Sequence, residues 1–576
     1  MGRFSQWRIY VLIFFVFLLG SVVLTRLFLL QILRYDDYSA LAQDQHQFLQ
    51  TLFPQRGEVF MQDLSSNQRS QEKYYVPLAV NKEFKRIYLI PREISSEEKD
   101  ILADELSCIL DLEKENILNR INKLDDPYEP LKHKVSQEIA QEVENLNTKG
   151  VKSSSETWRN YPNNSLACHI TGFVGMVSEK KIGQYGIEGY YENELKGEQG
   201  IFKGQRDTIG YSIPSLKQRL EPAQDGASIT LTIDQNIQFK AERELKQIIE
   251  KWDAESGTII IMEPQTGAIR AMANWPVFDP NEYGKVENID IFLNSSIQKV
   301  YEPGSVFKPI TMAAGLDSGY ISPGTVYQDK GQVRIKGSVI SNVDGKAYNE
   351  QTMTQVLEKS LNTGAVFIQQ KIGVDVFQDY VQRFDFDRPT GIDLIGEIGG
   401  NISNLYTGRE INLANISFGQ GITVTPLGLI TALGAIANKG KLMRPFIVEK
   451  VINQDGQETI AESQTVRQVI SPSSAEALTK MLVSVVDNGF GKPARIDGYS
   501  IAGKTGTAQV PDFEIGGYSD ETIHTFVGFA PAFDPKFIVL IKLDKPQGIR
   551  FASDSVSPVF KRIAEYLFNY LEIPPQ

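Results

Sequence analysis

Residues 301–316 read YEPGSVFKPITMAAGL. Lys308 follows Ser305 by three positions, a spacing that on a helix places both side chains on one face, within hydrogen-bonding reach. An uncharged lysine amine can accept the hydroxyl proton and make Ser305 a nucleophile without a histidine. The apolar neighbours predict burial, which lowers the pKa of a lysine. Pro309 requires the helix to begin close by, and simple helix capping by Ser305 is the alternative.

The S-x-x-K spacing alone is a weak signal because it occurs five times. Four of the five sites have polar or charged neighbours, and we interpret those four as ordinary surface. Only the site at Ser305 combines the spacing with an apolar helix. The starting residues are Ser70, Ser96, Ser178, Ser296 and Ser305.

A second candidate motif, Ser360-Leu361-Asn362, lies between two segments with helical patterns. On a turn, its alternate side chains can point together into a cleft. Ser360 then offers a proton relay, and the Asn362 amide offers both a donor and an acceptor to a peptide backbone. A capping or turn role is the alternative.

A third motif, Lys504-Thr505-Gly506-Thr507, follows the apolar stretch YSIA and is predicted to be a strand. Its cation and hydroxyls suit a terminal carboxylate, and Gly506 leaves room for a ligand backbone at the strand edge. Residues 498–505 also fit the phosphate-binding pattern G-x-x-x-x-G-K-[ST]. We reject a nucleotide site, because the glycines and Pro511 that follow do not predict the required helix.

Composition restricts the chemistry. The 576 residues are 41% hydrophobic and 23% charged, which indicates a globular chain of two to four domains. The net charge of −12 argues against nucleic-acid binding. Two cysteines, Cys108 and Cys168, and four scattered histidines leave little for a metal site. Catalysis is therefore expected from hydroxyl, amine and carboxylate groups, with no cofactor and no metal.

The N-terminal segment predicts a membrane anchor. Residues 9–25 are seventeen uncharged residues, about 26 Å of helix. Arg26 can snorkel, so the helix can continue to Leu33. Arg3 and Arg8 favour a cytoplasmic N-terminus. A retained single-pass anchor is favoured over a cleaved signal peptide, and either interpretation exports the rest of the chain, away from nucleotides.

The remaining pattern predicts three parts. Residues 1–34 are the cytoplasmic tip and anchor, residues 35–225 form an irregular exported pedestal, and residues 226–576 form a catalytic domain of mixed helices and strands. The turn-like EPAQDG at 221–226 is the predicted boundary.

The three motifs, in this order, resemble those of the penicillin-recognising serine transpeptidases. Further segments look like the transpeptidase domain and the pedestal of class B penicillin-binding proteins, so the resemblance covers nearly the whole chain. The KTGTAQ and LDKPQG segments are more similar to the septal, cell-division type than to the elongation type. The chain departs from the family pattern at Met61, Gln62 and Asn294-Ser295. The similar segments are YEPGSVFKP, TGIDLIGE, FGQGITVTP, AGKTGTAQ and TFVGFAPAFDPK, with RNYP, ITGFVG and GIEGYYENELKGEQG in the pedestal.

This resemblance implies an α+β fold: an antiparallel sheet sandwiched by helices, on an elongated pedestal with one transmembrane helix. It implies a peptidoglycan D,D-transpeptidase that cross-links stem peptides ending in D-Ala-D-Ala during septal wall synthesis, without a cofactor. β-Lactams are expected to bind it. Its expected partners are a membrane glycan polymerase and other division proteins, with no nucleotide or nucleic acid.

The resemblance also assigns roles to the motif residues. Ser305 is the expected nucleophile and Lys308 its general base. Ser360 passes a proton to the leaving amine, while Asn362 orients the substrate amide and holds Lys308. The remaining assignments are Lys504, Thr505 and Thr507 for the substrate carboxylate, Gly506 for strand-like docking, and the N–H groups of Ser305 and Thr507 for the oxyanion.

Two alternatives use the same residues. One is a hydrolase on the same fold, a D,D-carboxypeptidase or β-lactamase, in which water resolves the acyl-enzyme. The other is a non-catalytic penicillin-binding sensor or division scaffold. Glu188 and Glu192 suggest a separate carboxylate pair, but the sequence favours a solvated turn there.

Overall fold

The computed structural model describes residues 3–34, 47–67, 74–124, 126, 128–178, 180–206, 212–213, 219–511 and 516–575. The chain divides into two compact units. The first comprises residues 1–55 and 196–226, and the second comprises residues 56–195 and 227–576. All the predicted site residues lie in the second unit.

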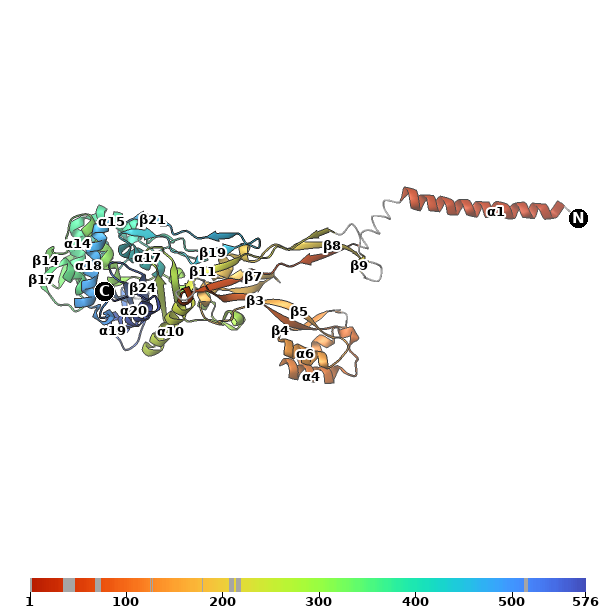
Figure 1. The fold of residues 1–576 in the computed structure, drawn as a ribbon, viewed down its shortest axis with the longest axis horizontal. Helices are drawn as coiled ribbons and strands as arrows, with labels where there is room; N and C mark the ends of the chain where they lie inside the picture. The colour runs from red at the N-terminus through yellow and green to blue at the C-terminus, as the bar shows by residue number, and fades with distance from the viewer. Residues whose placement is uncertain are drawn as a thin grey trace. The chain divides into compact units, whose positions relative to one another are not determined.

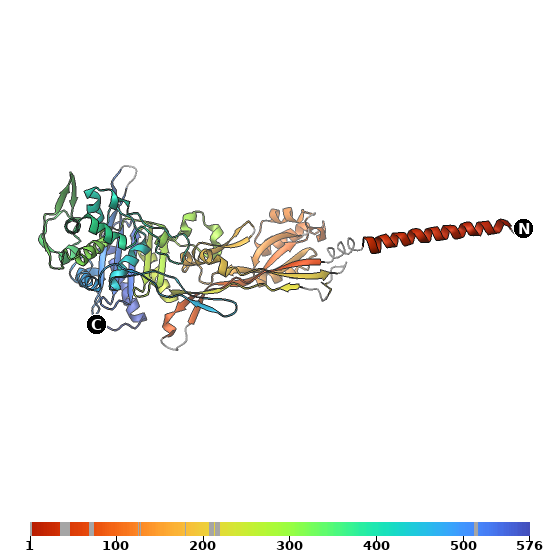
Figure 2. The same ribbon diagram turned by 90° about the horizontal axis from the view of Figure 1, so that it is seen from above.

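The first unit contains helix α1 (Arg3–Phe28), which continues as the π-helix η1 (Leu29–Leu33) and is drawn in red in Figures 1 and 2. Residues Trp7–Leu33 are long and apolar enough to cross a membrane. The helix therefore continues past Arg26, as predicted. The unit also contains a small antiparallel sheet. Its strands are β1 (Gln47–Leu52), β8 (Gly200–Arg206), β9 (Ser212–Ile213) and β10 (Arg219–Glu221).

The second unit is built around a five-stranded sheet in which every neighbouring pair is antiparallel. Two strands, one early and one late in this part of the chain, pair directly, with Ile260 opposite Leu540. In spatial order the strands are β13 (Ile269–Trp275), β12 (Ser256–Met262), β24 (Phe537–Asp544), β23 (Tyr518–Ala530) and β22 (Ala502–Pro511). The third motif thus lies on a strand at the sheet edge.

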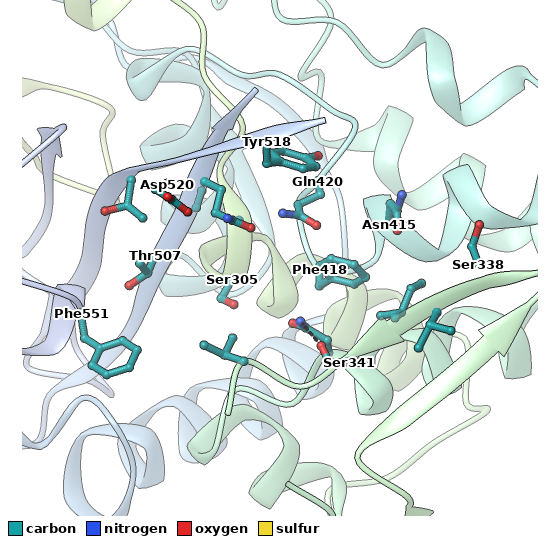
Figure 3. A pocket seen from close by; sticks show the side chains of 18 of the residues that line it. Ser305, Ser338, Ser341, Asn415, Phe418, Gln420, Thr507, Tyr518, Asp520 and Phe551 are labelled. Carbon is teal, nitrogen blue, oxygen red and sulfur yellow. Dashed lines mark hydrogen bonds between the residues drawn. The ribbon is translucent and has the colours of Figure 1, made fainter. Parts of the chain in front are cut away.

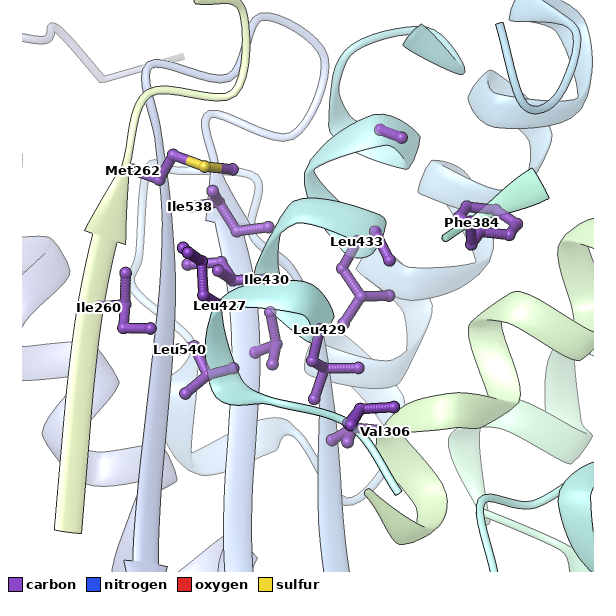
Figure 4. Close-up of a cluster of buried hydrophobic side chains, with 14 of the residues drawn as sticks. Ile260, Met262, Val306, Phe384, Leu427, Leu429, Ile430, Leu433, Ile538 and Leu540 are labelled. Carbon is purple, nitrogen blue, oxygen red and sulfur yellow. The ribbon is translucent and has the colours of Figure 1, made fainter. Parts of the chain in front are cut away.

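Helices cover both faces of this sheet. Helix α17 (Pro426–Ala437) packs on one face, as Figure 4 shows, and α10 (Gln235–Trp252) and α20 (Ser557–Tyr570) pack on the other (Figure 1). Successive residues along β12 and β24 alternate between the two cores because side chains alternate across a strand. Burial of one such side chain stabilises the fold by roughly 1.5–3 kcal/mol. The alternating sets are Ile260, Met262, Ile538 and Leu540 towards α17, and Ile259, Ile261, Val539 and Ile541 towards α10 and α20. The predicted sheet sandwiched by helices is confirmed.

A second sheet crosses the predicted boundary at residues 225 and 226. Strand β2 (Val59–Asp63) pairs in parallel with β11 (Ser228–Asp234), and Ile229 lies opposite Val59. Strands from the early and late parts of the chain therefore share one sheet. Its spatial order is β20 (Glu458–Ile460), β19 (Val448–Ile452), β11, β2, β3 (Tyr74–Leu89) and β4 (Glu129–Val135), and β5 (Val151–Asn160) also pairs with β3.

The Glu/Lys-rich segment after Ser95 forms a small lobe with its own apolar core. Ile87, Leu106 and Ile117 are completely buried in it. The charged residues of its helices consequently face outwards, as amphipathic helices require. Its helices are α4 (Lys99–Leu110), α5 (Lys114–Ile121) and α6 (Gln137–Asn145), which pack beside β3, β4 and β5.

The solvated turn predicted for the carboxylate pair is wrong for Glu188, which is 0% exposed in α8 (Gly186–Tyr190). Its carboxylate accepts hydrogen bonds from Arg56 Nε at 2.7 Å and Arg159 Nε at 2.6 Å. Burial opposes ionisation, but the two guanidinium groups prevail and lower the pKa of Glu188. The cations that compensate this buried charge lie far away in the sequence, so local context could not reveal them. Glu188 is a buried structural ion-pair centre.

Candidate active site

Ser305 lies in η5 (Gly304–Phe307), a short 3₁₀ turn that leads directly into α12 (Lys308–Asp317). Pro309 occupies the first turn of α12, where its missing N–H would have had no partner within the helix. The requirement that the helix begin close to Pro309 is therefore met. Every residue of α12 from Lys308 to Gly315 is buried.

Four predicted residues form a chain of hydrogen bonds. Lys308 Nζ lies 3.0 Å from Ser305 Oγ and 3.2 Å from Ser360 Oγ. Lys504 Nζ donates to the same Ser360 hydroxyl at 2.9 Å. Lys308 Nζ also donates to the Ser360 carbonyl. Residues separated by up to 199 positions in the sequence (305 to 504) are thus joined by one chain of hydrogen bonds.

Both lysines of this chain of hydrogen bonds are almost completely buried, each 1% exposed. Burial and the charge of Lys504 hold the pKa of Lys308 well below its ordinary value of 10.5. Burial lowers the pKa of Lys504 to about 7. The lowered pKa of Lys308 favours the uncharged amine beside Ser305.

Ser360 has a left-handed backbone with φ of 54°, which is uncommon for a residue with a side chain. This conformation costs roughly 1–2 kcal/mol. It forms the turn between α13 (Met353–Glu358) and α14 (Asn362–Ile372), where the Leu361 N–H donates to the Val356 carbonyl at 2.9 Å. The turn presents both the carbonyl and the hydroxyl of Ser360 to Lys308, so the strain supports the arrangement of the site.

Strand β22 and turn η5 approach each other closely. A methyl group at Gly506 would lie 3.0 Å from Val306 Cγ1 and 3.1 Å from the Pro303 carbonyl oxygen. The missing side chain of Gly506 therefore makes room for the nucleophile turn, and its expected role in ligand docking stays a prediction. Lys504 and Thr505 lie within this strand and do not open a helix, which agrees with the rejection of a phosphate loop.

The side chain of Asn362 has different neighbours from those expected. Its Nδ2 donates to the Ser341 carbonyl at 2.9 Å, and its backbone N–H donates to Asn342 Oδ1 at 3.1 Å. Among the described residues its partners are thus Ser341 and Asn342, and the expected hydrogen bond to Lys308 is not made. Because Nδ2 is the atom engaged by Ser341, the Oδ1 atom of Asn362 is the one suited to accept from a substrate N–H.

A network of buried polar side chains that the sequence analysis did not identify lies next to the Ser360-Leu361-Asn362 motif. Buried Asp329 accepts hydrogen bonds from Thr363 Oγ1 at 2.7 Å and from Asn342 Nδ2 at 3.0 Å. Asn342 in turn accepts from the N–H groups of Asn362 and Thr363. The network joins the loop after β16 (Ser338–Ser341) to the start of α14. Asp and Asn in loops are too common for the sequence to mark these two.

Ser305 lies at the junction of two adjoining pockets of about 660 and 140 Å³. Figure 3 shows Ser305 in the larger one, between Thr507 and Phe418. Asn362 lines the larger pocket, whereas Lys504 is buried behind the cleft. Thr505 and Ser360 line the smaller pocket. The structure thus brings the three motifs to one crevice.

Glu302 also supports this crevice, although the sequence offered it no role. Its carboxylate accepts from the Gly421 N–H at 2.9 Å and from Tyr518 Oη at 3.0 Å. Gly304 N–H donates to the Gly419 carbonyl at 2.9 Å, so the glycines of FGQG permit a close backbone approach. The position of Glu302 beside Ser305 was the available signal, but its partners lie more than 100 residues away.

The other S-x-x-K sites that the structure describes lie apart from this crevice. Ser96 and Ser178 are exposed, in agreement with the surface interpretation. Ser296 contradicts it, because this residue is completely buried and donates to Asn274 Oδ1 at 2.9 Å. Its partner, Asn274, lies on β13, and the residues next to Ser296 in the sequence do not indicate this contact. Ser70 lies outside the described residues.

Comparison with known families agrees with this fold. Residues 257–565 match the penicillin-binding protein transpeptidase domain, and residues 53–231 match the penicillin-binding protein dimerisation domain. The chain therefore belongs to the class B penicillin-binding proteins, in which these two domains are joined. It is accordingly a monofunctional peptidoglycan transpeptidase by family.

Individual relatives span most of the chain. Stage V sporulation protein D of Bacillus subtilis is 31% identical over 574 residues, covering 98% of this chain and 86% of that protein. Peptidoglycan D,D-transpeptidase FtsI of Escherichia coli is 30% identical over 508 residues, covering 87% and 82%. Penicillin-binding protein 2X of Streptococcus thermophilus has the same fold, with a TM-score of 0.74, 22% identity, and coverage of 92% and 81%.

Replacement of Asn342 tests the network behind the second motif. We expect Asn342→Ala to lower the free energy of unfolding by about 2 kcal/mol, because two backbone N–H groups and the Asp329 carboxylate lose a buried partner. Acylation by a fluorescent penicillin should slow as Asn362 loses its support. Denaturant unfolding and labelling kinetics measure the two effects. Asn453→Ala, at an exposed turn, is the control and should stay within about 0.5 kcal/mol of wild type. Equal behaviour of the two variants would contradict the support role.

Proposed function

We propose that the chain cross-links peptidoglycan stem peptides through an acyl-enzyme on Ser305. The hydroxyl attacks the penultimate D-alanine carbonyl, the terminal D-alanine leaves, and an amine of a second stem takes the acyl group. The observation that carries this proposal is the buried Lys308 amine, 3.0 Å from Ser305 Oγ and held there by Ser360. The two bonds exchanged are of similar kind, so the reaction needs no nucleotide and no cofactor.

Lys308 is the general base for acylation, since its lowered pKa leaves the amine uncharged. Ser360, within hydrogen-bonding distance of both lysines, passes the proton to the departing amine. Lys504 helps to keep Lys308 uncharged, because a second positive charge so close by would be repelled. This arrangement performs the task of a Ser-His pair with amines alone.

The substrate-binding residues are Asn362 for a stem amide and Lys504, Thr505 and Thr507 for the terminal carboxylate, with Gly506 allowing the close approach at β22. A carboxylate near Lys504 favours its charged form, so substrate binding raises the lowered pKa of this lysine. The N–H groups of Ser305 and Thr507 form the oxyanion hole, where one such donor is typically worth about 10²–10³ in rate.

The same proposal covers the chain's location and setting. Residues 1–34 anchor it in the cell membrane with a cytoplasmic N-terminus, residues 35–225 are the extracytoplasmic pedestal, and residues 226–576 are the transpeptidase domain. The apolar helix Trp7–Leu33 and the two matched domains support this organisation. Septal wall synthesis is the proposed role, supported by similarity to FtsI of Escherichia coli. A membrane glycan polymerase and other division proteins are the proposed partners.

β-Lactams should acylate Ser305 in place of the stem peptide. The test uses the detergent-solubilised full chain with benzylpenicillin, followed by intact-mass measurement and peptide mapping of the adduct. We expect one stoichiometric adduct, on Ser305, that persists for hours. Adduct turnover within seconds would favour the β-lactamase alternative. Cross-linked dimers formed from polymerised stem-bearing glycan would exclude the non-catalytic sensor, whereas release of D-alanine without dimers would favour the carboxypeptidase.

A further inference from the structure

The smaller of the two pockets at Ser305 has no assigned occupant after the terminal residue of the donor has left. Among the described residues, Thr505 and Ser360 line this pocket and not the larger one, whereas Asn362 and Gln509 line the larger pocket only. The residues assigned to catalysis and substrate binding are thus divided between the two pockets. Only a few of these residues, Ser305 among them, border both spaces.

The direction of β22 assigns the larger pocket to the donor stem. If the terminal carboxylate binds at Thr505 and Thr507, the terminal residue lies on the side of the smaller pocket. The rest of the donor stem then runs past Ser305 towards Gln509, along the larger pocket. Once Ser305 is acylated, the terminal residue leaves from the smaller pocket. The attacking amine must approach the acyl carbonyl on the face that the departing amine left, because Ser360 serves both proton transfers.

The smaller pocket has the chemistry to hold a cationic amine. Aromatic side chains of Tyr348, Phe490 and Phe551 line it, and the Asp344 carboxylate is at its rim. Asp344 accepts hydrogen bonds from Tyr348 Oη at 2.5 Å and from the Lys346 N–H at 3.1 Å, which fix the position of its charge. Aromatic faces and a carboxylate together attract an ammonium group. Lys359 also lines the pocket, but its Nζ hydrogen-bonds to Gln351 Oε1 and lies 5.2 Å from the Tyr348 ring centre.

We propose that the pocket bordered by Asp344, Tyr348 and Phe490 is the acceptor subsite, which receives the amine-bearing side chain of a second stem peptide after the terminal residue of the donor has left. This inference rests on the proposed serine mechanism. In the step itself, the amine nitrogen forms an amide bond to the acyl carbon, and the ester bond to Ser305 Oγ breaks. The bound ammonium first releases one proton to solvent and becomes the nucleophilic amine. The second proton, lost by the nitrogen as the amide forms, passes through Ser360 and Lys308 to Ser305 Oγ.

Two features of the pocket have separate roles in this step. Asp344 raises the local concentration of the ammonium form before the proton is lost. The aromatic walls exclude water, which competes with the amine for the acyl-enzyme. The pocket therefore determines the partition between cross-linking and hydrolysis of the acyl-enzyme.

The test compares two carboxylates that flank the same nucleophile. The detergent-solubilised full chain is acylated with a D-alanyl thioester, and a synthetic stem peptide with a free side-chain amine is the acceptor. We expect Asp344→Asn to raise the acceptor concentration for half-maximal aminolysis about two- to fivefold at low ionic strength, a difference that shrinks at high salt. Asp520→Asn, the same change in the larger pocket, should leave the acceptor dependence unchanged. Penicillin labelling should be no slower in Asp344→Asn than in the wild type, because the substitution removes a negative charge from the pocket.

A second variant tests the aromatic wall. Phe490 is 52% exposed, so Phe490→Ala should fold normally, and we expect it to increase the hydrolysed fraction of the acyl-enzyme about twofold or more. An unchanged acceptor dependence in Asp344→Asn, or an equal shift in Asp520→Asn, would overturn the acceptor assignment while penicillin labelling remained intact. Failure of the wild-type chain to form any penicillin adduct would instead overturn the serine mechanism, and the acceptor assignment with it.

Discussion

Ser305→Ala is expected to lose covalent labelling by a fluorescent penicillin completely and to lose cross-linking activity by at least about 10⁴-fold. The variant removes Ser305 Oγ, the hydroxyl oxygen that lies 3.0 Å from Lys308 Nζ. Binding of the substrate carboxylate at Thr505 and Thr507 should survive, because β22 is unchanged. Gel fluorescence after labelling of the full chain measures the first effect, and analysis of cross-linked dimers measures the second.

The control for this experiment is another S-x-x-K serine. Ser96 precedes Lys99 by the same spacing but is exposed, so Ser96→Ala should be labelled like the wild type. Both variants should unfold within about 0.5 kcal/mol of the wild type, since neither removes a large buried group. A penicillin adduct that persists in Ser305→Ala would refute the assignment of the nucleophile, and the mapped position of that adduct would identify its replacement.

Lys308→Met should reduce the acylation rate about 10³-fold and at the same time stabilise the fold. The rate falls because the general base is lost, an effect typically of about 10²–10⁴. The stability of the fold increases because an amine that is only 1% exposed is replaced by an apolar side chain of similar length. Loss of the hydrogen bond to the Ser360 carbonyl offsets part of this gain. We expect the free energy of unfolding at pH 8 to rise by about 1–3 kcal/mol.

The pH dependence of the free energy of unfolding shows why the substitution is stabilising at pH 8. The unfolded chain keeps the Lys308 proton up to about pH 10.5, whereas the folded chain has already released it at lower pH. The unfolded state binds more protons in this window, so the stability of the wild type falls as the pH decreases from 10.5. Lys504, with its pKa lowered to about 7, acts in the same direction between pH 10.5 and 7.

The stability difference between Lys308→Met and the wild type should therefore be large at pH 8 and shrink towards pH 10.5. Denaturant unfolding at the two pH values measures it. Lys299→Met changes the exposed lysine of another S-x-x-K pair and should show neither the gain nor the loss of acylation. A less stable Lys308→Met variant, or one labelled at the wild-type rate, would contradict a buried, uncharged base.

Some parts of the site could be predicted because their determinants are local. The three-residue spacing of Ser305 and Lys308 needs only one helical turn, and the apolar run after Pro309 indicates burial. The strand character of residues 502–511 was likewise visible in the sequence. Glu188 marks the limit, because Arg56 and Arg159, which allow its burial, lie 132 and 29 residues away. The polar residues around Glu188 predicted a solvated turn, and the structure shows that this prediction is wrong.

Residue spacing along short segments was enough to establish the apolar N-terminal helix, the strand character of the sheet segments and the identity of the three motifs. Folding in three dimensions was needed to establish that Lys308 and Lys504 share the hydroxyl of Ser360, that this serine adopts a left-handed backbone, and that Asp344 borders a second pocket. The shared hydroxyl and the second pocket depend on contacts between segments far apart in the chain. The lowered pKa of each lysine arises from burial that only those contacts produce.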